Sequence, residues 1–502
     1  MSDIKTGFDA IVHGALDSNV RIVTGVPGYP INDIMERFKL SPIKSDWSIN
    51  EKVALEIALG SSVCGNRAMV LTKHVGMNVL ADPLTISTTH TIGAGIIILV
   101  GDDPGAVSSQ NEQDSRYYGL ISEVPVFDPS TPSKLWKSIL LAYELSEYIR
   151  APVIIRTTNR LYNSKESFKR LLETKVLSEF GYLKASIWNL TMRGKHQLFH
   201  KESYPLMHEI SEKTNLNTCS NATLKSEIGI ISSGYPSYIV EDLKKDISHL
   251  TLGLVNPLPS LKIKEFVKKH NRILVVEETE PFIEMQLSLH PNILGKLTGH
   301  LPYGKIEKKD IIDALNNIHK DTMEREITVE TLGNRGYTRT ICEDCPYVPL
   351  YEVLKKIKNI PIAGDLGCSI YTASPPLHLI STAYSLGSAI SVATGFGKKG
   401  IAVIGDFGLA HSGIQGLINA VFNKHDVLVI VLQNDIAAMT GGQKVPDLTD
   451  LIYACTKDVE IIDFDHEKYN IKEVIKETIK EKFFASGVSV ILARGKCKKY
   501  PN

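Results

Sequence analysis

Apolar and polar residues follow one another along this chain in blocks that are typical of an α/β protein. Short, continuous apolar runs predict buried strands, and segments with helical apolar spacing separate them. The predicted strands of the first block are 21–24, 69–72, 96–100 and 153–156. Those of the second block are 228–231, 252–254 and 273–276. Strands that alternate with helices indicate parallel sheets.

This pattern divides the chain into four predicted parts. Residues 1–162 form a parallel-sheet domain, and 163–225 form a polar connecting segment with some helix. Residues 226–325 form a smaller α/β domain, and 326–502 form a second parallel-sheet domain. A length of 502 residues agrees with roughly three domains of about 150 residues each.

The stretch 401–443 holds the clearest candidate chemistry. Its strands are predicted at 401–404 and 427–432, and the helix between them carries one apolar face. That face consists of Ile414, Leu417, Ile418, Val421 and Phe422. A strand, helix and strand of this length form a right-handed βαβ unit. It places Asp406 and Asn434 at the carboxyl ends of neighbouring strands, where open α/β sheets bind ligands.

An Asp carboxylate and an Asn amide oxygen at one sheet edge suit Mg²⁺, whose coordination diphosphate oxygens often complete. Gly405 and Gly408 allow a phosphate to approach the backbone closely. Gly-Asp followed by an Asn at this spacing is the pattern of the thiamine diphosphate fold. The alternative is an ordinary strand–helix turn with an Asp cap and a loop Asn.

Glu51 also admits two interpretations. A helix is predicted to begin near Ser48, and Ser48-x-x-Glu51 has the form of a capping box, in which Glu51 only satisfies a backbone donor. Alternatively, Glu51 is the carboxylate that thiamine diphosphate needs at N1′ of its aminopyrimidine ring. The 401–443 stretch favours the second interpretation.

Composition narrows the function further. The formal net charge is zero, with 43% hydrophobic and 22% charged residues, so nothing indicates a nucleic-acid or anionic-membrane surface. The N-terminus lacks an apolar signal core, and the strongest apolar run, Ile92–Val100, is too short to span a bilayer. We therefore expect a cytoplasmic protein.

Few other residues point to chemistry. The seven cysteines do not suggest a disulfide framework. Cys342 and Cys345 form a CxxC pair that lacks two further ligands for zinc or an iron–sulfur cluster, so we interpret them as structural or incidental thiols. The acids at Glu277, Glu278 and Glu280 are interpreted as solvated or domain-contact groups.

Long motifs along almost the whole chain resemble one family. They include TGVPGYP from 24, SINEKVALEIALG from 48, KHVGMNVLADPL from 73 and DDPGAVSSQNEQDSRYYG from 102. VVEETEPFIE from 275, GDLGCSIYTASPPL from 364 and GDFGLAHSGIQGLINAVFNKHDVLVIVLQN from 405 continue the series. Together they resemble the α subunit of indolepyruvate:ferredoxin oxidoreductase, a thiamine diphosphate-dependent 2-oxoacid oxidoreductase.

This resemblance implies an architecture and a set of site residues. Residues 1–162 become a pyrimidine-binding domain, 226–325 a transketolase-C-like domain and 326–502 a diphosphate-binding domain. Glu51 becomes the N1′ carboxylate. The implied metal ligands are Asp406, Asn434 and the Ile436 carbonyl. The other implied cofactor contacts are Gly25, Pro27, Gly364, Asp365, Gly405, Phe407, Met439 and Leu386, which holds the cofactor bent or simply packs in the core. His74 and His411 are the implied catalytic histidines, and Thr24, Arg116 and Tyr347 the implied substrate contacts.

The chain also departs from the family pattern. Family α subunits continue into a ferredoxin-like domain with two cysteine-rich cluster motifs, and this sequence has no such cysteines. The family's CPGCPH is CEDCPY here, with Asp344 and Tyr347, and its GHQ is GGQ, with Gly442. We therefore expect no iron–sulfur cluster in this chain and clusters on a partner chain instead.

Three functions remain open at this point. The first is oxidative decarboxylation of an arylpyruvate-like 2-oxoacid to acyl-CoA, with electrons passing to ferredoxin through a partner such as a β-type subunit. The second is non-oxidative decarboxylation or carboligation by the same cofactor. The third is a regulatory subunit that binds thiamine diphosphate without turnover. A dimer or higher oligomer is expected, and the sequence does not reveal the 2-oxoacid or whether the site lies within one chain.

Overall fold

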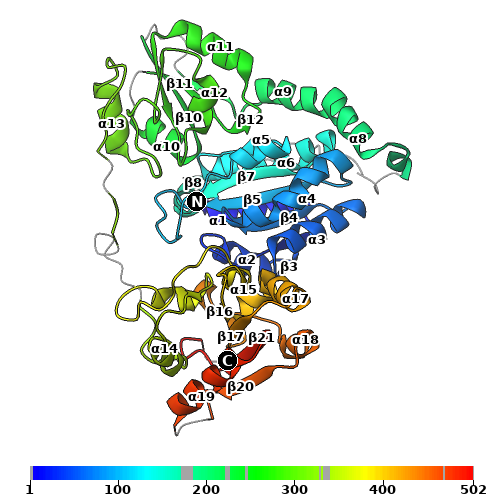
Figure 1. Ribbon diagram of the computed structural model, residues 1–502. Coiled ribbons are helices and arrows are strands. Elements are labelled where there is room, and N and C mark those ends of the chain that lie inside the picture. Colours follow the sequence, from blue (N-terminus) through cyan, green and yellow to red (C-terminus); the bar gives the residue numbers. More distant parts are fainter. Residues whose placement is uncertain are drawn as a thin grey trace. The chain divides into compact units, whose positions relative to one another are not determined.

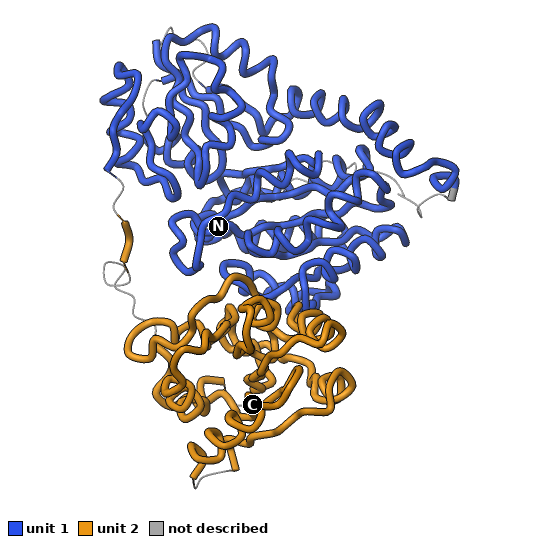
Figure 2. The backbone as a smooth tube through the Cα atoms, in the orientation of Figure 1, with its two compact units in different colours: residues 1–327 blue, residues 328–502 orange. Residues whose placement is uncertain are grey.

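The computed structural model describes residues 4–170, 185–220, 227–243, 247–326, 329–331, 340–466 and 470–500. Its contacts group the chain into two compact units, residues 1–327 and 328–502 (Figures 1 and 2), and each is described by itself. Parts of the predicted connecting segment, 171–184 and 221–225, lie outside the described residues. The mixed α/β class predicted from the sequence is confirmed.

The first sheet of unit 1 has the strand order β12-β6-β7-β5-β4-β2-β3. All neighbours are parallel except β12, which is antiparallel to β6. Its strands are β2 (Ile22–Gly25), β3 (Lys44–Trp47), β4 (Ala68–Lys73), β5 (Ile96–Asp102), β6 (Val126–Phe127), β7 (Val153–Thr158) and β12 (Leu254–Asn256). Every residue of β5 is buried, as expected for a central parallel strand.

The second sheet of unit 1 has the order β14-β13-β10-β11-β9. Its strands are β9 (Thr218–Ser220), β10 (Ile228–Ser233), β11 (Ser248–Leu252), β13 (Arg272–Val276) and β14 (Ile293–Leu294). The single strand predicted at 252–254 is wrong, because the chain passes from one sheet to the other at Gly253. The Asn217 side chain accepts from the N–H groups of Gly253 and Leu254, both at 2.9 Å, and so holds this crossing.

Helices connect and cover these strands. Around the first sheet they are α1 (Gly7–Asp17), α2 (Asn32–Lys39), α3 (Glu51–Val63), α4 (Gly76–His90), α5 (Tyr117–Ser122), α6 (Pro132–Ile149) and α7 (Asn159–Asn163). Around the second they are α10 (Gly234–Asp242), α11 (Ser260–Lys269), α12 (Phe282–Leu287) and α13 (Lys308–Asn316). Helix α1 packs on α6, and α3 packs on α4.

The connecting segment contains more helix than its polar composition indicates. Strand β8 (Lys165–Ser167) pairs with β1 (Ile4–Thr6). The described remainder forms η1 (Ala185–Asn189), α8 (Met192–Leu198), the π turn η2 (Phe199–Ser203), α9 (Tyr204–Lys213) and β9 of the second sheet. Phe199 and Met207 bury their side chains in the same apolar core as the first sheet, which explains why this segment is folded.

A buried ion-pair network joins the two sheets of unit 1. The Arg116 guanidinium donates to Asp114 and, at 2.7 Å, to Glu277, and Arg156 binds Asp102 at 2.6 Å. Burial alone would lower the pKa of Arg116, but Asp114 and Glu277 raise it above its usual value. Glu277 is therefore a domain-contact acid, and the solvated interpretation of it is wrong.

Unit 2 is built on a parallel sheet with the order β15-β16-β17-β21-β20. Its strands are β15 (Ile362–Ala363), β16 (Gly400–Gly405), β17 (Val427–Gln433), β20 (Val459–Asp463) and β21 (Val488–Arg494). Its helices and turns are α14 (Val348–Leu354), η3 (Cys368–Thr372), α15 (Ala389–Thr394), α16 (Asp406–Gly408), η4 (Leu409–Gly413), α17 (Ile414–Phe422), η5 (Ala438–Thr440), α18 (Thr449–Cys455) and α19 (Ile471–Phe484). The hairpin β18 (Ile436–Ala437) and β19 (Gln443–Lys444) lies beyond the sheet edge.

The apolar face predicted for the helix after β16 is partly wrong. In α17 the buried residues are Gly416, Leu417 and Ala420. Ile418 and Phe422 are 51% and 82% exposed. The small side chains allow α17 to approach α15 closely, and this rotates the larger apolar residues away from the core.

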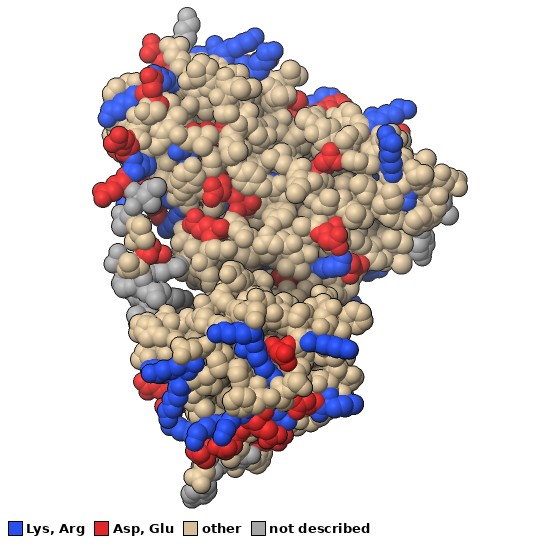
Figure 3. Space-filling view, in the orientation of Figure 1, with Lys and Arg blue, Asp and Glu red and all other residues tan. Residues whose placement is uncertain are grey.

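The charged side chains on the surface are of mixed sign. On the face that Figure 3 shows, Lys and Arg lie among Asp and Glu in both units, and neither sign dominates. This distribution agrees with the zero formal net charge. None of the described helices is long and apolar enough to cross a membrane.

Candidate cofactor site

The predicted sheet-edge pair in unit 2 comes together as expected from the parallel register. Strands β16 and β17 end side by side, with Gly405 opposite Leu432. Asp406 follows β16, and its Oδ2 accepts from the N–H groups of Asn434 at 2.9 Å and Asp435 at 2.6 Å. These bonds connect the start of one helix to the loop after the neighbouring strand.

The environment of Asp406 suits a cation. The side chain is buried, and burial raises the pKa of its carboxyl to about 7 although backbone N–H groups favour the ionised form. A buried carboxylate is stable when a cation pairs with it. With the Asn434 amide oxygen, which accepts from the Ile436 N–H at 3.2 Å, it forms an oxygen donor set that fits Mg²⁺.

Asp365, at the end of β15, is a second buried acid near this edge. Its Oδ1 accepts from the Gly387 N–H at 2.6 Å, and burial raises the pKa of the carboxyl to about 6. Its Oδ2 has no hydrogen-bond partner among the described residues and lies where a Cβ at Gly408 would be. A buried acceptor without a donor is uncommon and is consistent with a ligand-binding role.

The residues around Asp365 include four other predicted positions. The Leu386 carbonyl accepts from the Ser412 hydroxyl at 2.8 Å, and Ser412 Oγ lies 3.2 Å from His411 Nδ1. His411 is buried in the π turn η4, and its ring lies 6.3 Å from that of Phe407. Gly364 is also buried. Leu386 and Phe407 are only partly buried, so part of each side chain can contact a ligand.

The loop beyond Asn434 forms a small hairpin. The Gly442 N–H donates to the Ala437 carbonyl at 3.0 Å, and the Val445 N–H donates to the Asp435 carbonyl at 3.0 Å. Ile436 is buried at the base of this hairpin, while Met439 is half-buried in η5. The predicted cofactor residues of this loop are therefore held by backbone hydrogen bonds.

In unit 1, Glu51 is the first residue of α3 and not part of a capping box. The helix begins at Glu51 because Asn50 is its cap, with Asn50 Oδ1 accepting from the Lys52 N–H at 2.8 Å. The Ser48 hydroxyl bonds instead with the Thr24 hydroxyl at 2.6 Å. The capping interpretation of Glu51 is therefore wrong.

The Glu51 carboxyl is held near the start of α4. Glu51 is 7% exposed, and a Cβ at Gly76 would lie 2.6 Å from its Oε1, so only glycine allows this approach. A buried carboxyl held between the starts of two helices is oriented well enough to act as an acid or base.

The other predicted residues of unit 1 lie in the neighbouring strand ends. Thr24 and Gly25 are buried at the end of β2, and Pro27 is buried in the turn that follows. A Cβ at Gly25 would collide with the Leu71 carbonyl. His74, beyond β4, is completely buried, and burial lowers the pKa of its imidazole. It is therefore neutral at physiological pH.

Two predicted substrate contacts, Arg116 and Tyr347, are buried and already hydrogen-bonded within the fold. Arg116 is fully buried, and its N–H groups already donate to Asp114, Glu277 and two carbonyls of 278–280. A substrate carboxylate would have to displace these acceptors. Tyr347 is 3% exposed and donates its hydroxyl to the Gly495 carbonyl at 3.0 Å, which is a contact within the fold of unit 2.

A group of four cysteines in unit 2 was missed from the sequence. Burial, together with the neighbouring thiols of Cys368, Cys342 and Cys497, raises the pKa of the Cys345 thiol to about 12. Burial, with the neighbouring thiols of Cys497 and Cys342, also raises the pKa of the Cys368 thiol to about 11. These interactions indicate that the Cys368 and Cys497 thiols lie near the CxxC pair. In the sequence, Cys368 and Cys497 are single cysteines, in GDLGC and GKC, and neither stands at a metal-ligand spacing from the CxxC pair.

Comparisons with known proteins agree with this geometry. Residues 365–481 match the family model described as "Thiamine pyrophosphate enzyme, C-terminal TPP binding domain". The fold of 2-oxoglutarate:ferredoxin oxidoreductase from Magnetococcus marinus is similar, with a TM-score of 0.52 and 13% identity over 63% of this chain and 65% of that chain. The fold and this match define a thiamine diphosphate-dependent enzyme.

Two relatives specify the family. The chain is 31% identical over 475 residues to the indolepyruvate oxidoreductase subunit IorA of Methanothermobacter thermautotrophicus, covering 88% of this chain and 76% of the relative. It is 30% identical over 542 residues to the subunit of the same name from Methanothermobacter marburgensis, covering 98% and 86%. The chain belongs to the indolepyruvate oxidoreductase subunit IorA family, as its motifs predicted, and is a thiamine diphosphate-dependent oxidoreductase.

Proposed function

We propose that this chain catalyses the oxidative decarboxylation of an arylpyruvate-like 2-oxoacid to the corresponding acyl-CoA. One 2-oxoacid anion, one CoA thiol and two oxidised ferredoxins yield acyl-CoA, CO₂, two reduced ferredoxins and one proton. The observation that carries this proposal is the buried Asp406 carboxylate bound to the Asn434 loop, within a family of indolepyruvate oxidoreductase subunits. When bound, thiamine diphosphate supplies the carbon nucleophile and electron sink of this chemistry.

The residues of unit 2 would hold the diphosphate end of the cofactor. Asp406, Asn434 and the Ile436 carbonyl would bind Mg²⁺, and Gly405 would let a phosphate approach the backbone, since a Cβ there would meet no described atom within 4 Å. Leu386 and Met439, which are partly exposed, would contact the cofactor's apolar surface.

The residues of unit 1 would handle protons. Glu51 would share a proton with N1′ of the aminopyrimidine ring, which requires a buried and oriented carboxyl such as the one beside Gly76. Neutral His74 could accept a proton near the substrate, and His411 would serve the same purpose from unit 2. Thr24 would be a substrate contact. Arg116 would have a structural role, because its buried ion pairs with Asp114 and Glu277 fix the neighbouring loops.

We also propose that Cys342, Cys345, Cys368 and Cys497 bind an iron–sulfur cluster in this chain. The chain brings the segments together, because the Tyr347 hydroxyl donates to the Gly495 carbonyl, two residues before Cys497. Four cysteine thiolates are the ligand set of [4Fe–4S] clusters, and metal binding would remove the protons that burial favours. Such a cluster would accept the electrons one at a time, and a β-type partner would pass them on.

This proposal predicts the iron content of the chain. When the full chain is expressed alone and purified anaerobically, we expect about four iron and four sulfide per chain, with a cluster signal after reduction. Cys368→Ser should remove most of both. Cys455→Ser, a half-buried thiol elsewhere in unit 2, is the matched control and should leave both unchanged. Equal iron in the two variants would contradict the assignment.

The reaction type is tested with the anaerobic complex of the chain and its co-expressed partner. We expect 2-oxoacid oxidation that requires both CoA and a low-potential acceptor such as ferredoxin or viologen. Arylpyruvates should give the highest kcat/KM. Aldehyde or hydroxyketone formed without CoA or acceptor would instead support the non-oxidative decarboxylase or carboligase. Tight cofactor binding with no turnover on any 2-oxoacid would support a regulatory subunit.

A further inference from the structure

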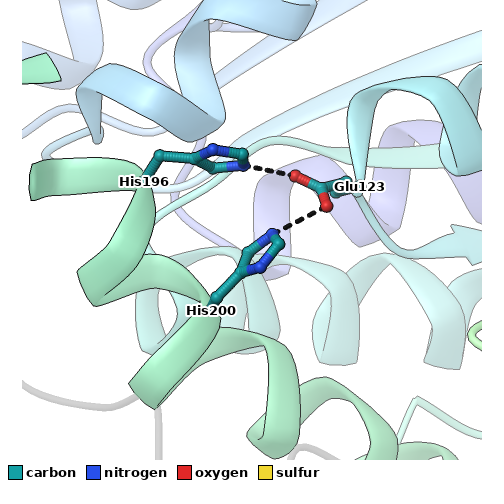
Figure 4. A group of neighbouring side chains, drawn as sticks. All are labelled: Glu123, His196 and His200. Atoms are coloured by element: carbon teal, nitrogen blue, oxygen red, sulfur yellow. Dashed lines mark hydrogen bonds and ion pairs between the residues drawn. The ribbon is translucent and has the colours of Figure 1, made fainter. Parts of the chain in front are cut away.

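Glu123, His196 and His200 form a group in unit 1 that the proposed reaction does not use (Figure 4). Glu123 ends α5, and the two histidines belong to the helical segment formed by α8 and η2. His196 Nε2 lies 2.6 Å from Glu123 Oε2, and His200 Nε2 lies 2.7 Å from Glu123 Oε1. One ligand atom from each residue lies within 4.8 Å of the others.

The backbone sets up this convergence from both sides. Residues four apart on a helix share a face, and the His196 and His200 rings lie 4.5 Å apart on it. The π turn η2 begins at Phe199, whose buried side chain anchors the segment between the two histidines. Glu123 adopts the left-handed conformation, with φ 56° and ψ 36°, which is uncommon for a residue other than glycine and aims its side chain at the histidines.

The group is accessible without being fully solvated. The side chains of His196, His200 and Glu123 are 38%, 48% and 29% exposed. An ion could therefore enter from solvent, and water could complete its coordination. Two imidazole nitrogens and one carboxylate oxygen, with an open fourth position, form a donor set that suits zinc among the divalent cations.

We propose that Glu123, His196 and His200 bind one zinc-class divalent transition-metal ion through two Nε2 atoms and one carboxylate oxygen. The carboxylate–nitrogen distances of 2.6–2.7 Å are hydrogen-bond distances. Because Zn–N and Zn–O bonds are each about 2.0–2.2 Å, the ligand atoms need to separate by less than about 1 Å to admit the ion.

The ion would fasten the connecting segment to the first sheet's helices. Helices α8 and α5 both pack on α4. The metal would therefore link α8 to the end of α5, two elements that already contact the same helix. Glu123 lies seven residues beyond Arg116, whose ion pairs join the two sheets of unit 1. The metal therefore has a structural role, separate from the Mg²⁺ and iron proposed in unit 2.

The test measures zinc in the full purified chain after exposure to Zn²⁺ and dialysis against metal-free buffer at pH 7.5. Glu123→Gln, His196→Asn and His200→Asn should each lose one equivalent relative to wild type. The matched control is His208→Asn, since His208 lies on α9 in the same helical segment and outside the group. Zinc on the cysteines of unit 2 would remain in all variants and so cancels in the comparison.

Two further measurements keep the test independent of folding defects. The difference between the Co²⁺ spectra of wild type and Glu123→Gln should show d–d absorption without a thiolate charge-transfer band, because Co²⁺ on the cysteines of unit 2 contributes equally to both. Amide hydrogen exchange in 192–203 should slow at least about tenfold with Zn²⁺ in wild type and not in Glu123→Gln. Equal zinc in wild type and all three variants, or unchanged exchange, would mean that the group is only a pair of His–Glu hydrogen bonds and would overturn the proposal.

Discussion

Replacing Glu51 by glutamine is expected to lower kcat by about 10²–10⁴-fold, the usual contribution of a positioned acid or base. The amide keeps the size and burial of the side chain next to Gly76 but cannot exchange a proton with N1′ of the cofactor. Binding of thiamine diphosphate, measured by calorimetry, should therefore change little. The measurement is steady-state 2-oxoacid oxidation by the complex under saturating cofactor.

Glu56→Gln is the matched control for this experiment. Glu56 lies on the same helix, but it is exposed and pairs only with Lys52 at 3.3 Å among the ion pairs that the structure describes. Its replacement should leave kcat within about twofold, because exposed pairs of this kind contribute little. If Glu51→Gln retained full activity, the assigned role of Glu51 would be wrong.

Replacing Asp406 by alanine should mainly weaken cofactor binding, whereas Glu51→Gln should mainly lower kcat. The variant removes a metal ligand and leaves the N–H groups of Asn434 and Asp435 without their acceptor. We expect the Kd for Mg²⁺–thiamine diphosphate to rise about 100-fold or more, since changes even in the residues that support metal ligands cost 10–100-fold. Activity should return partly at high cofactor concentration.

Asp435→Asn serves as the control for Asp406→Ala. The Asp435 side chain is exposed, and asparagine tolerates its left-handed backbone, with φ 62°. The Kd should stay within about threefold of wild type. Equal cofactor affinity in the Asp406→Ala variant and in wild type would place the metal elsewhere.

The pKa of Asp406 adds a pH dependence to cofactor binding. Burial raises this pKa to about 7, so below pH 7 a proton competes with Mg²⁺ for the carboxylate. Affinity for Mg²⁺–thiamine diphosphate should therefore fall by up to about tenfold per pH unit below 7 and level off above it. In the Asp406→Ala variant this slope should disappear in calorimetric titrations between pH 5.5 and 8.

The sequence predicted the elements whose signal is local. Runs such as 96–100 and 427–432 are continuous apolar strands because both faces of a parallel sheet are covered, and both formed. The meeting of Asp406 and Asn434 followed from the same register.

Features that depend on distant contacts were not predictable. Small residues rotated α17, so Ile418 and Phe422 of the predicted apolar face are exposed while Leu417 is buried. The Thr24 hydroxyl removed Ser48 from the predicted cap. Cys368 and Cys497 join the CxxC pair only through the fold of unit 2, and nothing near Glu123 in the sequence indicates His196.

In our proposal, one cofactor is held by Asp406 and Asn434 and activated by Glu51. An experimental structure of the complex with thiamine diphosphate and Mg²⁺ tests it directly. We predict the metal on the Asp406 carboxylate and the Asn434 amide oxygen, with a Glu51 carboxyl, from the same or a second copy of the chain, hydrogen-bonded to N1′ of the same cofactor. A cofactor whose metal or pyrimidine ring contacts other residues would contradict the account.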